Sequence, residues 1–358
     1  MPQTNASAVF TGQQFAPEPA RLSVRQTAQP SAISRMTMKA IRHDSYGAIG
    51  SLTLRDVDTP MIKDDQVLVR VRAAGLHIGD CFGVRGSPYL MRLHSGLVKP
   101  KYGVPGFDVA GVVEAVGSKV TRFEPGDKVF GECNGACAEF ACVSETKLVK
   151  KPANLDFESA AAVPTSALAA LHALRDVAGV RPGQKVLING ASGGVGTFAI
   201  QIAKSYGAHV TAVCSATNAA MVRSIGADEV VDYTRQDFTL DGPRYDVILD
   251  NIENRSLADC RRALKADGCL ILNSGTGASG FGMLVRLFKP LLLSPFARQR
   301  LCRYLSVPGH EDLNVLKRML EAGQMKPVID KTFTLGKTAD ALRYIENGHT
   351  SGKVVVIV

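Results

Sequence analysis

The sequence has no tryptophan, few other aromatic residues and no long hydrophobic run. Aromatic side chains make up 6% of the 358 residues and are not interleaved with basic clusters, so no nucleic-acid partner is expected, although the formal net charge is +9. The most apolar segment, residues 281–296, is interrupted by two basic residues and two prolines, which argues against an integral membrane span. The diffuse positive charge instead favours solubility and attraction for anionic ligands.

A secretory signal is also lacking, because no basic stretch is followed by an apolar one near the N-terminus. The eight cysteines are therefore expected to be mostly free thiols in a reducing compartment, and we expect a cytoplasmic protein. Cys133, Cys137 and Cys142 form one cluster in a segment that reads as a strand. Three cysteines without a nearby histidine fall short of a structural zinc site, so the pattern favours buried thiols and no metal.

Residues 1–35 differ from the rest of the chain. Gln, Ser, Ala and Pro dominate, no hydrophobic period is visible, and three arginines face a single glutamate. The composition predicts a disordered tail. An organellar targeting segment would leave the same pattern, as would a start codon misassigned upstream of Met36 or Met38.

The hydrophobic pattern divides the remaining chain into two domains. Strand-like segments punctuated by glycine, at 39–41, 52–57 and 66–71, predict an irregular β-barrel with little helix over residues 36–160. A helical pattern at 159–178 opens an alternation of short strands and helices, typical of a doubly wound parallel sheet over residues 161–304. The predicted strands of this second domain are residues 186–188, 210–213, 230–231, 247–249 and 270–272. Helices at 313–321 and 339–347 and a strand at 353–358 are expected to return to the first domain, which residues 305–358 complete.

A glycine-rich turn is the strongest single motif. An apolar strand from residue 185 leads into Gly190 and then into Ala191, Ser192, Gly193, Gly194, Val195 and Gly196, and a helical pattern follows over 197–206. Glycines at such a turn allow a tight bend, a close approach to a pyrophosphate and close packing of helix on strand, while the helix N-terminus offers free N–H groups. The motif predicts a dinucleotide site.

The end of the next strand indicates which dinucleotide binds. An NAD site usually carries an acidic residue there, to accept from the ribose 2′-hydroxyl. This chain has Cys214 and Ser215 instead, followed by Thr217 and Asn218, which are neutral donors. The pattern favours NADP(H), although no basic residue lies in the loop, so Arg223 or Arg235 would have to reach the 2′-phosphate.

Several blocks in their expected order resemble the medium-chain dehydrogenase/reductase superfamily and, within it, the zinc-free quinone oxidoreductase-like branch. Besides the glycine turn, the matching blocks are residues 75–80, 105–117, 125–129, 160–164, 226–228 and 351–354. The resemblance implies an α/β fold with a GroES-like irregular β-barrel catalytic domain and a Rossmann doubly wound parallel sheet. Zinc-dependent members have a histidine where this chain has Phe107, and the region of residues 164–166 lacks their later cysteine.

The implied reaction is hydride transfer from NADPH to a quinone or an α,β-unsaturated carbonyl, without catalytic zinc. In this branch an Asn-Pro-x-Asp block lines the site; Asp80 matches its last residue and His77 replaces its first. His77 is either a donor to the developing enolate oxygen or a packed turn residue. Tyr89 is a second candidate donor, with a core or rim aromatic as the alternative.

The resemblance also implies further cofactor contacts. Tyr233 matches a residue placed near the 2′-phosphate, and Gly352 and Lys353 match a terminal element that touches the cofactor or substrate loop. Thr165, Asn251, Ser274 and Gly275 fall where the nicotinamide half is expected.

Two other functions stay open. One is a zinc-free oxidoreductase of an alcohol and aldehyde pair, and the other is a non-catalytic NADPH-binding structural or sensor protein. The apolar segment 282–296 is expected to be buried or at a homodimer interface; a lid over an apolar substrate and a patch on a membrane surface are the alternatives.

Overall fold

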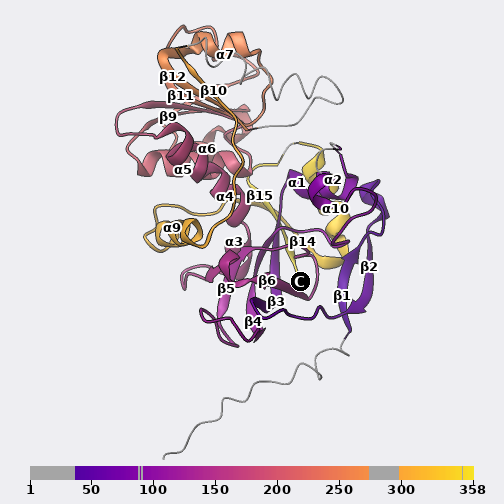
Figure 1. Ribbon diagram of the computed structural model, residues 1–358. Coiled ribbons are helices and arrows are strands. Elements are labelled where there is room, and N and C mark those ends of the chain that lie inside the picture. The colour runs from indigo at the N-terminus through magenta and orange to yellow at the C-terminus, as the bar shows by residue number, and fades with distance from the viewer. Residues whose placement is uncertain (1–36, 88, 90–91, 274–297, 349) are drawn as a thin grey trace, which may run out of the picture.

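The computed structural model describes residues 37–87, 89, 92–273, 298–348 and 350–358. In Figure 1 these residues form an upper unit built on a parallel sheet and a lower unit built on a mainly antiparallel sheet. Helix α4 (Pro164–Leu171) lies at the junction of the two units. Among the described residues, no helix has the length and apolar character that crossing a bilayer requires.

The upper unit contains a six-stranded sheet in which every pair is parallel, in the order β10-β9-β8-β11-β12-β13. Its strands are β8 (Lys185–Asn189), β9 (His209–Cys214), β10 (Glu229–Asp232), β11 (Tyr245–Asp250), β12 (Leu264–Leu272) and β13 (Arg300–Cys302). Its helices are α5 (Gly194–Ser205), α6 (Ala219–Ser224) and α7 (Leu257–Ala263). This strand order is that of the Rossmann fold.

The two faces of the parallel sheet are covered by different helices. Val186 of β8 packs in one cluster with Phe198 of α5, whereas Leu187 packs in another with Cys260 of α7. Because successive side chains of a strand point to opposite faces, the continuous apolar run of β8 is buried on both sides. The prediction of a doubly wound parallel sheet is therefore confirmed.

The lower unit contains a seven-stranded sheet in the order β14-β15-β3-β4-β5-β7, with β6 also paired to β3. These strands are β3 (Gln66–Leu76), β4 (Asp108–Val116), β5 (Lys128–Glu132), β6 (Phe140–Ser144), β7 (Leu148–Lys150), β14 (Ile329–Thr334) and β15 (Lys353–Ile357), while β1 (Thr37–Arg42) and β2 (Thr53–Asp58) form a separate antiparallel pair. The remaining helices are α1 (Ile78–Arg85), α2 (Arg92–Ser95), α3 (Phe157–Ala161), α9 (His310–Glu321) and α10 (Thr338–Glu346), and a π-helix spans His172–Ala178. Strand β15 pairs with β3, so the final strand returns to the lower unit as predicted.

Some elements differ from the sequence prediction. Helices α1 and α2 occupy a region in which little helix is predicted, and β13 and β14 are not predicted at all. The helical pattern at 159–178 is interrupted, because Pro164 lacks an N–H and starts a new helix at its first position. The cysteine cluster is not one strand: Cys133 and Cys137 lie in the loop between β5 and β6, and Cys142 lies on β6.

One hydrophobic cluster joins the two units. It contains Phe130 of β5 in the lower unit, Leu168 of α4 and Phe198 of α5 in the upper unit, and all three side chains are fully buried. Burial of apolar surface is worth about 25 cal/mol per Å², so this shared cluster favours one fixed arrangement of the two sheets. Both edges of the candidate site are therefore held in place by a common core.

Candidate active site

The glycine turn lies where the order of the parallel sheet reverses. Strand β8 has β9 on one side and β11 on the other, and ligands of open α/β sheets bind at the carboxyl ends of strands at such a switch point. Gly190 has a positive φ of 74°, and a Cβ at Gly196 would lie 2.3 Å from the Gly190 carbonyl oxygen. These two positions need glycine for the bend itself.

The start of α5 is suited to an anion. Its N-cap is Gly193, which offers no side-chain cap, and the first turn has no acidic residue. A Cβ at Gly193 would meet only the Gly190 oxygen, at 3.5 Å. Ala191 is buried, whereas Ser192 and Val195 are half-buried. The free N–H groups and the open space at Gly193 fit a pyrophosphate.

The polar residues predicted for the adenosine end lie together beyond β9. Ser215 Oγ is 2.8 Å from Thr217 Oγ1, and Asn218 Nδ2 donates to Ser215 Oγ at 3.4 Å. The Tyr233 N–H donates to the Cys214 carbonyl, which holds Tyr233 at the same edge of the sheet, with 47% of the residue exposed. Ser351 Oγ donates to Asn218 Oδ1 at 2.8 Å, so the segment before β15 reaches this end of the site.

The residues predicted for the nicotinamide end come from both units. Asn251 follows β11 and donates to the Asn189 carbonyl from its backbone N–H and its Nδ2. A parallel β-bridge joins Gly193 to Gly352, and a Cβ at Gly194 would lie 3.1 Å from Lys353 Cδ. The structure thus brings the glycine turn against the C-terminal segment. The predicted contacts Ser274 and Gly275 lie outside the described residues.

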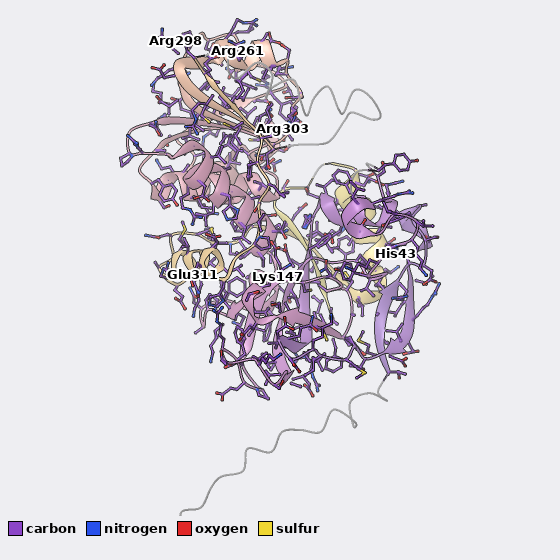
Figure 2. All side chains as sticks on the ribbon, in the orientation of Figure 1. His43, Lys147, Arg261, Arg298, Arg303 and Glu311 are labelled. Carbon is purple, nitrogen blue, oxygen red and sulfur yellow. The ribbon has the colours of Figure 1, made fainter. Side chains whose placement is uncertain are left out.

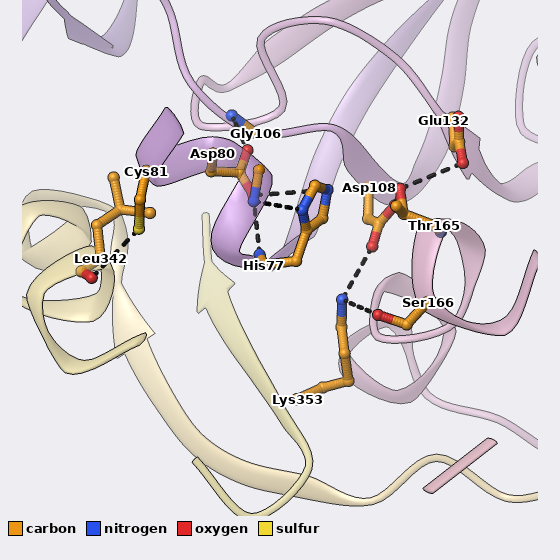
Figure 3. A network of polar contacts seen from close by, with 11 residues as sticks. His77, Asp80, Cys81, Gly106, Asp108, Glu132, Thr165, Ser166, Leu342 and Lys353 are labelled. Atoms are coloured by element: carbon orange, nitrogen blue, oxygen red, sulfur yellow. Dashed lines mark hydrogen bonds and ion pairs between the residues drawn. The ribbon is translucent and has the colours of Figure 1, made fainter. Parts of the chain in front are cut away.

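Lys353 and Thr165 belong to a buried polar network, shown in Figure 3. Lys353 Nζ lies 3.2 Å from Asp108 Oδ2 and 3.1 Å from Ser166 Oγ. Thr165 donates to Asp108 Oδ1 from its backbone N–H at 2.9 Å, and its Oγ1 is 2.5 Å from the same oxygen. Glu132 Oε1 lies 3.2 Å from Thr165 Oγ1 on the other side. Lys353 and Asp108 are 1% and 0% exposed, so their charges compensate each other inside the protein.

The environment of Glu132 changes its ionisation. Burial, reinforced by the nearby Asp108, raises the pKa of the Glu132 carboxyl to about 7. The carboxyl therefore holds a proton over part of the neutral range.

His77 has one structural and one unpaired nitrogen. It is the N-cap of α1: its Nδ1 accepts from the Gly79 N–H at 3.0 Å, and its own N–H donates to Asp80 Oδ2 at 2.8 Å. Since Nδ1 is an acceptor, the neutral ring carries its hydrogen on Nε2. Among the described residues, buried Nε2 has no hydrogen-bond partner, and its distance to Asp80 Oδ2 is 3.8 Å. The ring stacks on Phe107 with 5.5 Å between centroids.

Asp80 is placed as a support for this histidine. It is 1% exposed, and its second oxygen accepts from the Gly106 N–H at 3.0 Å. Burial raises the pKa of Asp80, while the neighbouring His77 opposes the rise. Its oxygens thus tie α1 to the loop before β4, a geometry that favours positioning over direct contact with a substrate.

Tyr89 lies apart from this network. It is 76% exposed, and the Arg92 guanidinium lies 4.7 Å from the centre of its ring. Its assignment as a proton donor stays a prediction.

The sequence pattern missed three residues of the network, Asp108, Glu132 and Ser166. Asp108 directly follows Phe107 in one of the blocks that carry the resemblance. That block was interpreted only as lacking the zinc-ligating histidine, so no role was assigned to Asp108. Within the described residues, no group of three or more His, Cys, Asp or Glu side chains is arranged to hold a metal ion. Cys133 and Cys137 are buried free thiols and Cys142 is a half-buried one.

Comparisons with known proteins agree with this geometry. Residues 63–153 match the family model of the alcohol dehydrogenase GroES-like domain, and residues 225–356 match that of a zinc-binding dehydrogenase. The chain is 34% identical over 340 residues to a chloroplast envelope quinone oxidoreductase homolog of Arabidopsis thaliana, covering 89% of this chain and 98% of the relative. It is 33% identical over 334 residues to the chloroplastic NADPH-dependent alkenal/one oxidoreductase of the same plant, covering 89% and 79%.

A solved structure shares the fold. The quinone oxidoreductase from Coxiella burnetii superposes with a TM-score of 0.79 at 31% identity, covering 90% of this chain and all of that one. Identity at this level over about nine-tenths of the chain, together with the Rossmann strand order and the glycine turn, identifies the protein family. The chain belongs to the medium-chain dehydrogenase/reductase superfamily, in its quinone oxidoreductase branch.

Proposed function

We propose that this protein is an NADPH-dependent reductase of quinones or α,β-unsaturated carbonyl compounds. The observation that carries the proposal is the meeting of the glycine turn with Lys353 and Ser166 at the switch point of the parallel sheet. The names of the relatives, a quinone oxidoreductase homolog and an NADPH-dependent alkenal/one oxidoreductase, support both the cofactor and the class of acceptor.

The residues present fit NADP(H). The start of α5, with Gly193 as its N-cap, leaves free N–H groups and open space for the pyrophosphate. Strand β9 ends at Cys214 and is followed by Ser215, without a carboxylate to repel a 2′-phosphate. Tyr233 lies at the same edge of the sheet, and we place it near the 2′-phosphate. Bound NADPH would supply a hydride from its nicotinamide C4.

The chain's own residues orient the acceptor and donate a hydrogen bond to its oxygen. We assign this donor role to His77, because its Nε2 is buried and has no hydrogen-bond partner among the described residues, with Asp80 Oδ2 at 3.8 Å. A hydrogen bond to the oxygen on which negative charge develops stabilises the transition state more than the ground state. The Gly79 N–H, which donates to Nδ1, keeps the ring in that tautomer, and Asp80 holds the backbone of His77 by accepting from its N–H.

The test is oxidation of NADPH with para- and ortho-quinones, enones and 2-alkenals as acceptors, with NADH in parallel. Turnover with at least one of these acceptors and a preference for NADPH are the expected results. Tight NADPH binding without turnover of any acceptor would overturn the enzymatic assignment and favour a structural or sensor role.

Two further assignments belong to the same proposal. We infer a homodimer, which the molar mass from light scattering would check, since a monomeric mass at micromolar concentration contradicts it. We also place the protein in the cytoplasm, unless residues 1–35 direct import into an organelle. Imaging fluorescent fusions of the full chain and of residues 36–358 separates these cases, because only a targeting segment makes the two distributions differ.

A further inference from the structure

Two carboxyl groups lie within hydrogen-bond distance of one hydroxyl group in the candidate site. Strands β4 and β5 are antiparallel neighbours, and their register places Asp108 directly opposite Glu132. Both side chains reach Thr165 at the start of α4: Asp108 Oδ1 lies 2.5 Å and Glu132 Oε1 lies 3.2 Å from Thr165 Oγ1 (Figure 3).

The number of hydrogens decides how these three groups can be bonded. A threonine hydroxyl has one hydrogen to donate, and a carboxylate has none. The shorter contact gives that hydrogen to Asp108, whose oxygens also accept from the Thr165 N–H and lie next to the Lys353 ammonium. The contact between Glu132 and Thr165 therefore needs a hydrogen on Glu132. Without it, two acceptor oxygens compete for one hydroxyl hydrogen.

Ionisable side chains of both signs surround Glu132. The elements packed against β5 carry Asp108 and Glu114 on β4, Lys150 on β7 and Glu158 on α3, whereas α4 has none. Lys128 lies on β5 itself, Cys133 follows Glu132, Lys147 precedes β7, and Lys353 acts from β15. Those that act on the ionisation of Glu132 are Asp108, which disfavours the anion, and Lys147 and Lys353, which favour it. Lys147 lies in the lower unit (Figure 2), and Lys353 is already paired with Asp108.

We propose that Glu132 is a positioning residue for the cofactor site: its neutral carboxyl donates to the Thr165 hydroxyl, which donates to Asp108, and this hydrogen-bond chain holds Lys353 and Ser166 against the glycine turn. Burial and Asp108 raise the pKa of Glu132 to about 7 although a hydrogen bond from Thr165 would lower it, so a proton on the carboxyl agrees with the hydrogen count. Loss of the proton puts a second negative charge beside Asp108 and removes the donor to Thr165.

The hydrogen-bond chain continues to the glycine turn through Lys353, which contacts the other carboxylate oxygen of Asp108. Lys353 Nζ also bonds to Ser166 Oγ, and a Cβ at Gly194 would lie 3.1 Å from Lys353 Cδ and 3.2 Å from Ser166 Oγ. Gly352, the residue before Lys353, forms the β-bridge with Gly193. Ionisation of Glu132 is therefore expected to loosen the pyrophosphate cradle. This consequence rests on the proposed function, whereas the hydrogen-bond chain itself does not.

The sign of the pH effect follows from the raised pKa. The folded protein holds the proton of Glu132 more tightly than the unfolded chain, whose glutamate has its ordinary pKa of 4.5. The stability due to this group is fully present below that value and is lost as the pH rises through about 7. Glu132→Gln keeps a neutral side chain that can donate at every pH, and its stability lacks this decline.

The experiment measures thermal unfolding without cofactor and the Kd of NADPH from about pH 5 to about pH 8, for wild type, Glu132→Gln and Glu124→Gln. Glu124 is an exposed glutamate in the lower unit and serves as the matched control. We expect wild type and Glu124→Gln to lose stability and NADPH affinity, the latter several-fold, relative to Glu132→Gln as the pH rises. Parallel profiles for wild type and Glu132→Gln would overturn the proposal.

Two variants test whether the effect passes through Thr165. Each is made alone and in combination with Glu132→Gln. Thr165→Val removes the hydroxyl and is expected to abolish the effect of Glu132→Gln on the pH dependence of NADPH affinity, whereas Thr165→Ser keeps the hydroxyl and retains that effect. The pH dependence of unfolding is expected to persist in both variants, because burial of Glu132 is its main cause. An effect of Glu132→Gln on NADPH affinity that survives in Thr165→Val would show that Glu132 acts by another route and would overturn the proposal. If the wild type binds no NADPH, the proposed function fails, but the unfolding profiles without cofactor still decide whether Glu132 is neutral in the folded protein.

Discussion

His77 combines two duties that can be separated because they fall on different ring nitrogens. Its Nδ1 accepts from the Gly79 N–H at the start of α1, and its buried Nε2 has no hydrogen-bond partner among the described residues. An unpaired buried donor costs about 1–3 kcal/mol, so its persistence calls for a ligand group or another explanation. The carbonyl oxygen of an acceptor is a group of the right chemistry.

A pair of substitutions separates the two duties. In His77→Ser the hydroxyl can still cap α1 but is too short to replace Nε2, so we expect near-normal unfolding and a kcat lower by about 10²-fold, the usual effect of losing one such donor. His77→Ala loses the cap as well, and its stability falls by about 1 kcal/mol more. Steady-state kinetics and thermal melts check both; an unchanged kcat in His77→Ser would remove His77 from the chemistry.

The network around Asp108 shows what residue patterns could not predict. Asp108 and Lys353 are 245 positions apart in the sequence, and their ion pair exists only because β15 returns to β3 beside β4. Nothing near Glu132 in the sequence marks its carboxyl as buried. The glycine turn was predictable because its residues are contiguous and each meets a local steric demand, whereas this network is assembled by tertiary packing.

At the scale of elements, the turn between β8 and α5 contains glycines with different duties. A Cβ at Gly196 would lie 2.3 Å from the Gly190 carbonyl oxygen and 2.7 Å from backbone atoms of Ala191. Because these neighbours are backbone atoms, they cannot rotate away as a flexible side chain could. At Gly193 the nearest atom would be 3.5 Å away and φ is −78°, an ordinary value. Gly196 is therefore needed by the fold, and Gly193 by an approaching ligand.

Two alanine substitutions test this division. Gly196→Ala is expected to lower the free energy of unfolding by about 1–3 kcal/mol, the usual cost of forcing an extra group into a packed site. Gly193→Ala is expected to leave unfolding unchanged but to raise the Kd of NADPH, because its methyl group occupies the space that the pyrophosphate needs. Urea titrations and NADPH titrations check the pair. Equal losses of stability in both variants would contradict the division.

The elements that the sequence did not predict have physical reasons in common. Helix α1 contains Gly79 and Gly83, poor helix formers in a region rich in turns, and its N-cap is a histidine instead of Ser, Thr, Asp or Asn. Strand β13 has only three residues, too few for an alternating pattern to show. The long strands of the upper unit are apolar on both faces, and that composition made them predictable.

At the scale of the whole molecule, β15 belongs to the lower sheet while its first residue touches the cofactor turn of the upper unit. Lys353 begins this strand, pairs with Asp108 on β4 and contacts Ser166 of α4, the helix that both units share. The ion pair thus lies at the point where the two sheets approach each other. Its contribution is expected to appear in the stability of the whole chain and in cofactor affinity together.

A double-mutant cycle measures this contribution. Lys353→Met leaves the Asp108 charge buried without its partner and is expected to cost about 3–5 kcal/mol of unfolding free energy. Adding Asp108→Asn removes that charge while keeping an acceptor oxygen for Thr165, so the double variant should recover a large part of the loss. Urea unfolding of the four proteins gives the coupling energy. Simple additivity of the two single losses would mean that the pair does not join the sheets, and NADPH affinity would then be expected to follow Lys353 alone.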